Sequence, residues 1–401
     1  MAITGVEVRL LRLDQVEPFD SAGGIVIGQR PLTIVRLVGD EGFGWGECEA
    51  LPQAGYTPEW AAGAFTRIRD DLAPGLLGTP LSSRAVRAVV RDHLPIAPMA
   101  VAAVEQAALD GELRASGRSL AQWLGVPGSG PPGGEVVISE ASGGRSGHAE
   151  VDARSGTGRA PSVPAGAVVG LAPDLDTLVE RVAILVAAGY VRVKVKVRPG
   201  WDVEPLGVLR RTFATLELQA DGNGSYTEDD AIALAPLADF GLTCLEQPLP
   251  ADDLAGAARL RRRLGVPLAA DESASTPSGV EATLRAGAAD VVVVKPARLG
   301  GLQAALAVHG RCAAGGVGLM AGGLLEAGLG RRALVAVAAL PGFTVTGDCS
   351  PSSRWLAGDP WPEMDLVDGR VPVHLGPGVA PEPVLERLDR ATIDRVVLGD
   401  V

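Results

Sequence analysis

The segment Val191-Arg192-Val193-Lys194-Val195-Lys196-Val197 decides the fold. Its β-branched and cationic residues alternate with a period of two, which is typical of a β-strand. Because side chains two positions apart share one face of a strand, Lys194 and Lys196 point one way and the four valines point the other. If the valines pack against helices, the two ammonium groups face the interior. A charge buried there requires a partner, since desolvating it alone is expensive.

The scarcity of lysine strengthens this interpretation. Of the 36 Lys and Arg residues, only Lys194, Lys196 and Lys295 are lysines. All three lie at or near the ends of Val-rich segments, since Lys295 follows four consecutive valines. Arg keeps its proton, whereas a buried Lys can lose one and act as a base. We therefore expect these positions to need an amine; the alternative is that they are ordinary surface side chains.

Composition narrows the classes of protein that fit. A chain of 401 residues has room for two to three domains. The net charge of −12 and the lack of a basic run with interleaved aromatic residues argue against nucleic acid as the partner. The four cysteines are far apart and form no CxxC pair, which disfavours a disulfide framework or a thiolate zinc site. No signal peptide or membrane span is expected, so the sequence predicts a cytoplasmic location.

The chain divides by pattern into four parts. Residues 1–126 combine short alternating segments, typical of an antiparallel meander, with amphipathic helices, and predict the first part of an α+β domain. Residues 127–163 contain a Gly/Ser/Pro-rich insertion and linker. Residues 164–354 alternate strand and helix patterns. Residues 355–401 do not continue that repeat, and we expect this tail to pack back on the N-terminal meander.

The alternating region predicts a barrel. Its candidate strands are residues 167–171, 191–196, 216–221, 242–246, 267–271, 290–295, 316–321 and 343–348. Apolar strands that alternate with helices indicate a parallel sheet, and eight of them suggest a closed barrel. The alternative is an open doubly wound sheet, which is weakened because no GxGxxG follows the first strand.

Three acids end successive strands of this barrel. Asp221, Glu246 and Asp271 are 25 residues apart (221 to 246 and 246 to 271), which is one strand-plus-helix unit per step. They should meet at the barrel rim that carries the reacting groups. Three clustered carboxylates need a cation, and oxygen ligands without His or Cys suit Mg²⁺ or Mn²⁺. The alternative for any single acid is a helix cap or an ion pair with Arg.

Amines beside such a cation indicate a reaction class. The proton α to a carboxylate is very weakly acidic, and a divalent ion can stabilise the enediolate that forms when it leaves. A lysine of lowered pKa can then take that proton. Lysines on the second and sixth strands would face each other across the substrate, which offers a base on either face. The expected partner is a small carboxylate substrate.

These residues, taken in order, resemble the enolase superfamily and its muconate-lactonizing subgroup. The motifs that carry the resemblance are Lys194-Val195-Lys196, Asp221-Gly222-Asn223, Glu246-Gln247-Pro248, Asp271-Glu272-Ser273 and Lys295 to Gly301. Segments 322–331, 347–350 and 44–48 are similar to the o-succinylbenzoate synthase and N-acylamino acid racemase family. The resemblance implies a (β/α)₇β barrel, a modified TIM barrel, with an α+β capping domain built from both ends of the chain.

The resemblance also implies roles for individual residues. Asp221, Glu246 and Asp271 would bind Mg²⁺. Lys196 would be the base on one face, Lys194 would assist through its charge, and Lys295 would act on the opposite face. Residues expected to contact the substrate are Phe19 and Tyr56 on two capping loops, with Asn223, Arg298, Gly322, Gly323 and Glu326 in the barrel.

Three functions follow as hypotheses. The first is a Mg²⁺-dependent o-succinylbenzoate synthase, which removes the α-proton and expels water. The second is an N-acylamino acid racemase that uses Lys196 and Lys295 as two bases, and the third is a non-catalytic binding barrel. A dipeptide epimerase fits less well, because those enzymes carry a second acid where this chain has Ser350. We also expect a homo-oligomer.

Overall fold

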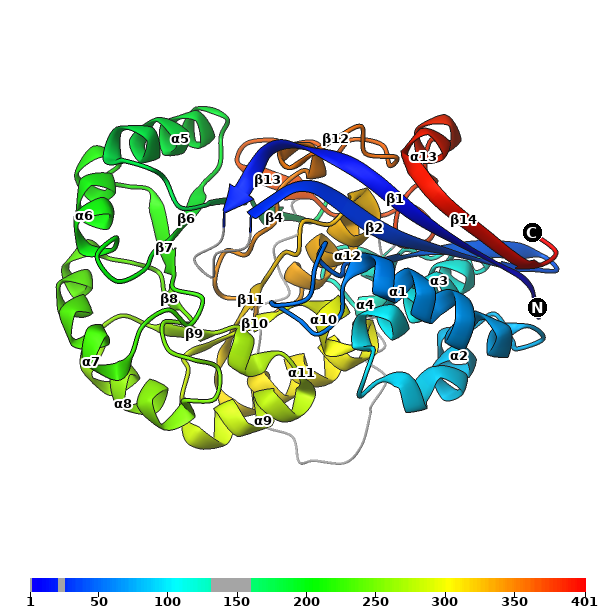
Figure 1. Cartoon of the computed structure of the whole chain (residues 1–401), viewed down its shortest axis with the longest axis horizontal. Coiled ribbons are helices and arrows are strands. Elements are labelled where there is room, and N and C mark those ends of the chain that lie inside the picture. Colours follow the sequence, from blue (N-terminus) through cyan, green and yellow to red (C-terminus); the bar gives the residue numbers. More distant parts are fainter. Residues whose placement is uncertain (1, 21–25, 131–159) are drawn as a thin grey trace.

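The computed structural model describes residues 2–20, 26–130 and 160–401 (Figure 1). Two bodies are visible: a ring of strands and helices built from the middle of the chain, and a sheet with helices built from both of its ends. The N- and C-termini lie close together at the far end of that sheet. The predicted fold, a barrel with an α+β cap, is confirmed. The predicted domain boundaries remain predictions, and most of the insertion at 127–163 lies outside the described residues.

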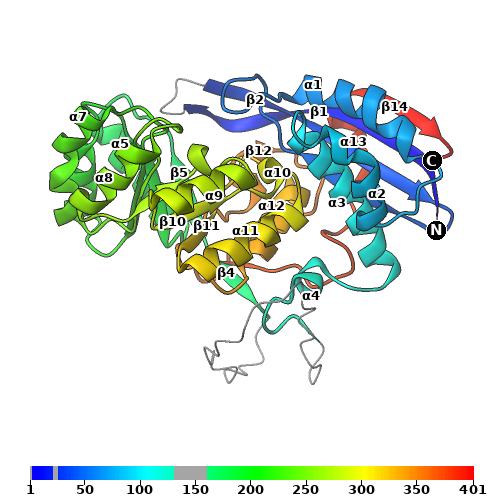
Figure 2. The same cartoon turned by 90° about the horizontal axis from the view of Figure 1, so that it is seen from below.

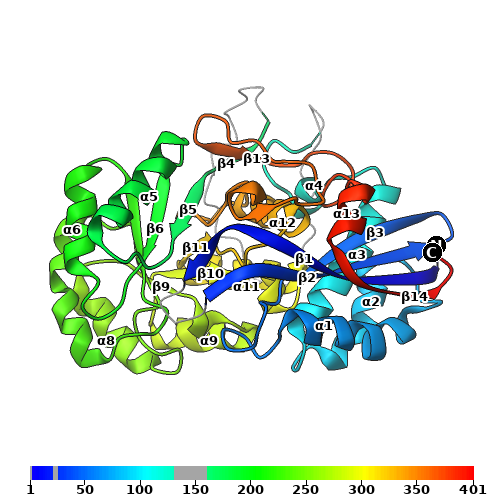
Figure 3. The ribbon, with the colours of Figure 1, turned by 45° about the horizontal axis from the view of Figure 1, so that its top comes forward.

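The cap sheet is antiparallel and joins the two ends of the chain. Its strands run in the order β12-β1-β2-β3, and β14 also pairs with β1. Their bounds are β1 (Ile3–Asp20), β2 (Val26–Gly39), β3 (Gly42–Cys48), β12 (Leu356–Ala357) and β14 (Thr392–Gly399). β1 and β2 are far longer than the short strands predicted, and they continue beyond the cap over the barrel (Figures 2 and 3).

The cap also contains helices, some of which cover one face of this sheet. They are α1 (Ala61–Arg67), α2 (Ser83–Val90), α3 (Pro98–Ala115) and α4 (Leu120–Leu124), with short helical turns at Ile68–Leu72, Ala73–Leu76 and Arg91–His93. The predicted helix at 99–115 is therefore confirmed as α3. It lies directly on β3, because a Cβ at Gly44 or Gly46 would collide with the α3 backbone. The apolar side chains between sheet and helices form a separate core for the cap.

The barrel contains seven parallel strands in sequence order. They are β5 (Gly166–Val169), β6 (Arg192–Lys196), β7 (Glu217–Asp221), β8 (Leu245–Glu246), β9 (Leu268–Ala270), β10 (Val291–Val294) and β11 (Gly318–Ala321). The helices lie outside them (Figure 1). These are α5 (Leu175–Ala187), α6 (Val203–Thr212), α7 (Glu228–Ala231), α8 (Leu254–Leu264), α9 (Pro277–Ala286), α10 (Pro296–Leu299), α11 (Leu302–Gly315) and α12 (Gly328–Ala338).

The eighth strand predicted at 343–348 is irregular, yet it closes the barrel. Its one ladder contact in the described structure joins Val345 to Met320 of β11. On one side Asp348 N donates to Ala321 O at 2.8 Å, and on the other Gly166 N of β5 donates to Cys349 O at 3.0 Å. The chain passes so close to β11 that a Cβ at Gly347 would strike Ala321. The alternative of an open sheet is therefore wrong.

Strand β6 has the predicted two faces. Val193 and Val195 are buried in the main apolar core, and Lys194 and Lys196 are buried on the other side. Val191 departs from the prediction, because it precedes the strand and is 41% exposed.

Other predictions need correction or refinement. The short strand after Asp368, β13 (Arg370–Pro372), pairs with β4 (Ser162–Pro164) rather than with the meander. The helix predicted at 227–239 starts as expected, since Thr227 Oγ1 accepts from Asp230 N, but it tightens into a 3₁₀ helix at Ile232–Phe240. α13 (Leu385–Ala391) and a turn at Ser352–Arg354 complete the tail. None of the described helices is long and apolar enough to cross a membrane.

Candidate active site

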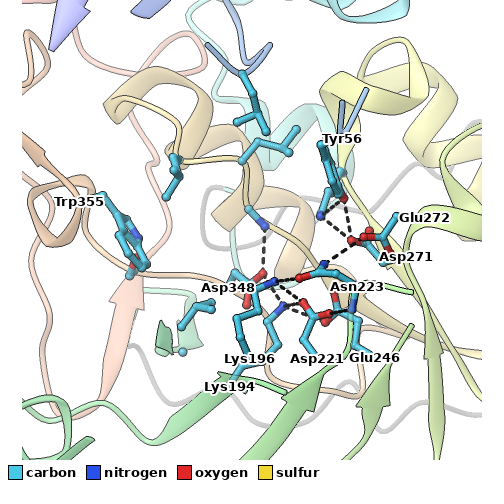
Figure 4. A pocket seen from close by; sticks show the side chains of 18 of the residues that line it. Tyr56, Lys194, Lys196, Asp221, Asn223, Glu246, Asp271, Glu272, Asp348 and Trp355 are labelled. Carbon is cyan, nitrogen blue, oxygen red and sulfur yellow. Dashed lines mark hydrogen bonds and ion pairs between the residues drawn. The ribbon is translucent and has the colours of Figure 1, made fainter. Parts of the chain in front are cut away.

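A cavity of about 380 Å³ lies where the carboxyl ends of the barrel strands face the cap. Both bodies line it. Its walls are Leu51, Gly55, Tyr56, Gly166, Val168, Lys194, Lys196, Asp221, Asn223, Glu246, Asp271, Glu272, Lys295, Gly323, Leu324, Leu325, Arg331, Asp348, Ser350 and Trp355. Figure 4 shows Lys194 and Lys196 clustered with the acids on one side, with Trp355 well apart from them. The cavity thus has a charged part and a largely apolar part.

Lys194 lies at the centre of the charged part. Its Nζ is 2.8 Å from Glu246 Oε2, 3.0 Å from Asp348 Oδ2 and 3.9 Å from Asp221 Oδ2. Burial alone would lower the pKa of Lys194, but Asp348, Glu246 and Asp221 outweigh it and raise that pKa well above its usual range. Lys194 therefore carries a fixed positive charge.

Lys196 and Lys295 reach the cavity from opposite staves. Lys196 Nζ is 2.7 Å from both Asp221 Oδ2 and Asn223 Oδ1. Lys295 Nζ is 2.8 Å from Asp271 Oδ2 and also contacts the hydroxyl of Tyr56. Lys196 ends β6, and Lys295 follows β10, four positions along the sheet. In a barrel of eight strands, four strand positions correspond to half the circumference. The two amines therefore face the cavity from opposed sides.

The three predicted metal ligands share the floor of this cavity. Glu246 is fully buried, and burial, together with Asp221, raises its pKa to about 8. Burial alone would raise the pKa of Asp271. Arg298 and Lys295 outweigh it and lower that pKa well below the usual range. Among the groups that the structure describes, Glu246 Oε1 has no hydrogen-bond partner.

The donor set fits a divalent cation, although its geometry is not preformed. No group of three or more His, Cys, Asp or Glu side chains within the described residues is already arranged around a common point. The lysine ammonium groups hold the carboxylates instead. The oxygen-only set and the unpartnered Glu246 Oε1 suit Mg²⁺ or Mn²⁺. A cation would take over contacts that lysines now make.

Tyr56 brings the cap into the site. It lies on the loop after β3, and its hydroxyl donates to Asp271 Oδ2 at 2.7 Å (Figure 4). Burial raises the pKa of Tyr56 well above its usual range, so the hydroxyl keeps its proton. The other predicted cap residue, Phe19, has its backbone in β1 opposite Ile27, but its side chain lies outside the described part of the chain.

The remaining predicted residues separate into two groups. Asn223 and Gly323 line the cavity as expected. Arg298, Gly322 and Glu326 do not line it, and substrate contact by these three stays a prediction. Arg298 lies behind Asp271 and donates to its backbone carbonyl at 2.9 Å.

Gly322 and Glu326 support the wall from behind. A Cβ at Gly322 would be 2.7 Å from Lys295 Cε, so the glycine leaves room for that side chain. Glu326 pairs with Arg331 at 2.5 Å and accepts from Leu324 N at 2.6 Å.

Sequence reasoning missed Asp348 as a site residue. Its carboxylate accepts from Arg192 at 2.8 Å, from Lys194 at 3.0 Å and from Gly323 N at 3.2 Å. Despite burial, Lys194 and Arg192 lower the pKa of Asp348 far below its usual range. Asp348 could have been predicted as a site residue, because it is an acid at the end of the last predicted strand. Other cavity residues not predicted include Glu272, whose pKa burial and Asp271 raise to about 7, together with Arg331 and Trp355.

A capped barrel with opposed lysines above clustered acids defines a class of enzyme site, and sequence comparison names the family. The family model described as "Enolase C-terminal domain-like" matches residues 177–386. The model described as "Mandelate racemase / muconate lactonizing enzyme, N-terminal domain" matches residues 5–125. The chain belongs to the enolase superfamily.

Individual relatives carry two different names. The chain is 37% identical to an N-succinylamino acid racemase from an Amycolatopsis species over 404 residues, with 100% of each chain covered. It is 33% identical to an o-succinylbenzoate synthase from Geobacillus kaustophilus, covering 96% of this chain and 95% of that one. Among solved structures, an enolase superfamily member from Listeria innocua superposes with a TM-score of 0.84 at 28% identity, covering 100% and 99%.

Proposed function

We propose that this protein removes the proton α to the carboxylate of a small acylated substrate and returns it to the other face, as an N-succinylamino acid racemase. The observation that carries this proposal is the entry of Lys196 and Lys295 into one cavity from opposed staves of the barrel. A two-base exchange needs an amine on each face of the α-carbon. The N-succinylamino acid racemase from Amycolatopsis, which aligns over the whole chain, supports the choice of substrate.

Asp221, Glu246 and Asp271 would hold a divalent cation, which we propose to be Mg²⁺. Members of the superfamily are generally Mg²⁺-dependent. When bound, the cation would supply positive charge near the substrate carboxylate as an enediolate develops. Lys194, which also pairs with Asp348 at 3.0 Å, would add a second positive charge on the same side of the cavity.

The proton transfers balance on the two lysines alone. Lys196 Nζ takes the α-proton from one face, and Lys295 Nζ gives a proton to the other face. The substrate changes configuration and nothing else, while each lysine ends in the opposite protonation state. The reverse reaction begins from that state. Tyr56 closes the cavity on the Lys295 side and helps exclude water from the reacting carbon.

A second candidate is the dehydration that forms o-succinylbenzoate, which the sequence alone placed first. There Lys196 would take the α-proton and pass it to the departing hydroxide, so that water leaves and the ring becomes aromatic. The apolar walls at Leu51, Leu324, Leu325 and Trp355 would accept such a ring, and relatives at 33% identity and below carry this name. The opposed second lysine is the reason for placing racemisation ahead.

Both reactions can be assayed on one preparation with Mg²⁺. Proton NMR in D₂O follows exchange of the α-proton of each N-succinylamino acid enantiomer, and polarimetry follows its racemisation. Ultraviolet absorbance follows aromatisation of the hydroxycyclohexadiene carboxylate. We expect exchange and racemisation with both enantiomers. Aromatisation without racemisation would favour the second candidate. Lack of both activities, together with no binding of divalent cations in a titration, would leave only the non-catalytic barrel.

A further inference from the structure

Arg30 of the cap holds part of the cavity wall that belongs to the barrel. Its side chain is fully buried, and its guanidinium donates to five backbone carbonyls. Three of these are in the cap, and two, at 3.1 Å each, are in the barrel: those of Pro31, Glu49, Ala50, Leu324 and Leu325. Leu324 and Leu325 line the cavity, but Arg30 does not. One buried cap residue is therefore bonded to two wall residues.

Glu47 of the cap makes a second connection to the barrel, at residues that follow Leu325 in the chain. Its carboxylate accepts from Ala327 N at 2.7 Å and from Gly330 N at 2.8 Å, at the start of α12. Glu47 lies on β3 and is buried. The first N–H groups of a helix have no partner inside the helix, and the helix dipole favours a negative charge there. The cap strand thus supplies the two acceptor oxygens that anchor a barrel helix.

The segment between these two anchors depends on them for its shape. Residues 322–327 form no helix or strand. Leu325 has a φ of +59°, a left-handed conformation that is unfavourable for a residue with a side chain. Such a conformation persists where surrounding contacts determine it, and Arg30 bonds to the carbonyl of Leu325 itself.

We infer that Arg30 and Glu47 are positioning residues through which the cap sets the selectivity of the site for the acyl group of the substrate. Arg30 donates to the carbonyls of Leu324 and Leu325, two apolar residues of the cavity wall, and Glu47 anchors the helix that follows them. This inference rests on the proposed function, because it assumes a substrate with an acyl chain. It assigns these two residues no contact with the substrate.

The variant Glu47→Gln tests the inference with little change in shape. The Gln oxygen can accept from one of the two N–H groups, but its amide group then faces the other, so α12 loses half of its anchor. The measured quantity is the ratio of kcat/KM for an N-succinyl and an N-acetyl derivative of the same amino acid. We expect this ratio to change by about fivefold or more, mainly through KM, because a shifted wall alters binding of the acyl chain.

Asp110→Asn is the matched control. Asp110 is also a buried carboxylate that accepts from two backbone N–H groups, those of Trp45 at 2.9 Å and Val379 at 2.7 Å, and it pairs in addition with Arg114 at 2.7 Å. Its bonds stay within the N-terminal part and the tail, away from the cavity wall. This variant should lose stability as Glu47→Gln does, yet keep the wild-type ratio. A general loss of folded protein would lower the apparent kcat/KM for both substrates by the same factor and leave their ratio unchanged.

Hydrogen exchange gives a readout that needs no substrate. In Glu47→Gln, the amides of Ala327 and Gly330 should exchange faster than in wild type, and in Asp110→Asn they should not. An unchanged acyl ratio in Glu47→Gln would overturn the inference, whether or not exchange increases. A wild-type protein that turns over neither derivative would overturn the proposed function and the acyl role with it. Turnover of both derivatives with an unchanged ratio would overturn the acyl role alone.

Discussion

Lys196 and Lys295 reach the same cavity and differ in the hydrogen bonds that the described residues make with them. Among the described hydrogen bonds, those of Lys196 go to Asp221 and Asn223, which both belong to the barrel. Lys295 is held by Asp271 of the barrel and by Tyr56 of the cap. The described hydrogen bonds of Lys196 thus come from the barrel, whereas those of Lys295 come from both the barrel and the cap.

The contrast shows how one barrel can support related reactions. A reaction that needs a single base can use Lys196, whereas exchange between two faces also needs Lys295, which Tyr56 of the cap contacts. The cavity floor serves both sides. Variants that act on the floor, on one side or on neither should therefore give distinct results.

The largest effect is expected at the shared floor. Glu246→Gln removes one carboxylate of the proposed cation site, and should lower kcat/KM by about a thousandfold for both enantiomers, because both faces depend on the same charge. Wild-type protein with a chelator should behave in the same way, and added Mg²⁺ should restore it. Cation binding is measured by calorimetric titration. Full activity in the variant and in the chelator would contradict a metal-assisted floor.

Asp348→Asn should mainly cost stability. Asp348 is the acid between buried Arg192 and Lys194, and its removal leaves both with a weaker partner. We expect a loss of about 3 kcal/mol in the free energy of unfolding at neutral pH. Because the folded pKa of Asp348 lies far below the usual value, its contribution is present above about pH 4 and is lost as the pH falls.

Denaturant unfolding of wild type and variant between pH 7 and pH 3 measures this contribution. The difference in stability between the two proteins should shrink as the pH falls below about 4. A difference that stays constant over that range would show that the charge of Asp348 is not its source.

Tyr56→Phe should affect one side only. The variant removes the hydroxyl that contacts Lys295 and Asp271 but keeps the ring. Exchange of the enantiomer whose α-proton faces Lys295 should slow by about tenfold, because that amine loses a positioning contact. The other enantiomer should change by less than about twofold. Equal slowing of both enantiomers would show that the cap acts on the whole cavity.

The smallest effect is expected outside the site. Asp174 caps the start of α5 through Thr177 N at 2.7 Å, on the outer surface of the barrel. Asp174→Ala should lower the free energy of unfolding by about 1 kcal/mol, as loss of an N-cap does. The exchange rates of the two enantiomers should keep their wild-type ratio. A changed ratio would mean that a general loss of barrel stability can itself alter exchange of one enantiomer more than the other.

Local patterns in the sequence predict a good part of this arrangement. The alternation in β6 shows that two lysines face inward, and the regular spacing of three acids places them at one rim. Both patterns work because strand periodicity and the strand-helix repeat depend on neighbouring residues.

What the sequence did not predict depends on contacts between distant residues. Asp348 pairs with Arg192, 156 positions away. Arg298 lies behind the cavity wall, where it contacts Asp271, and Glu326 lies there in contact with Arg331. In the irregular eighth strand, Gly347 passes tightly against β11, a contact that no local pattern encodes.

Exchange of each enantiomer in D₂O by the variants Lys295→Met and Lys196→Met tests the opposed lysines most directly. Lys295→Met should lose α-proton exchange with one enantiomer and keep it with the other, and Lys196→Met should show the reverse. Loss of exchange with the same enantiomer in both variants, or unchanged exchange in Lys295→Met, would contradict a site in which two lysines act from opposite faces.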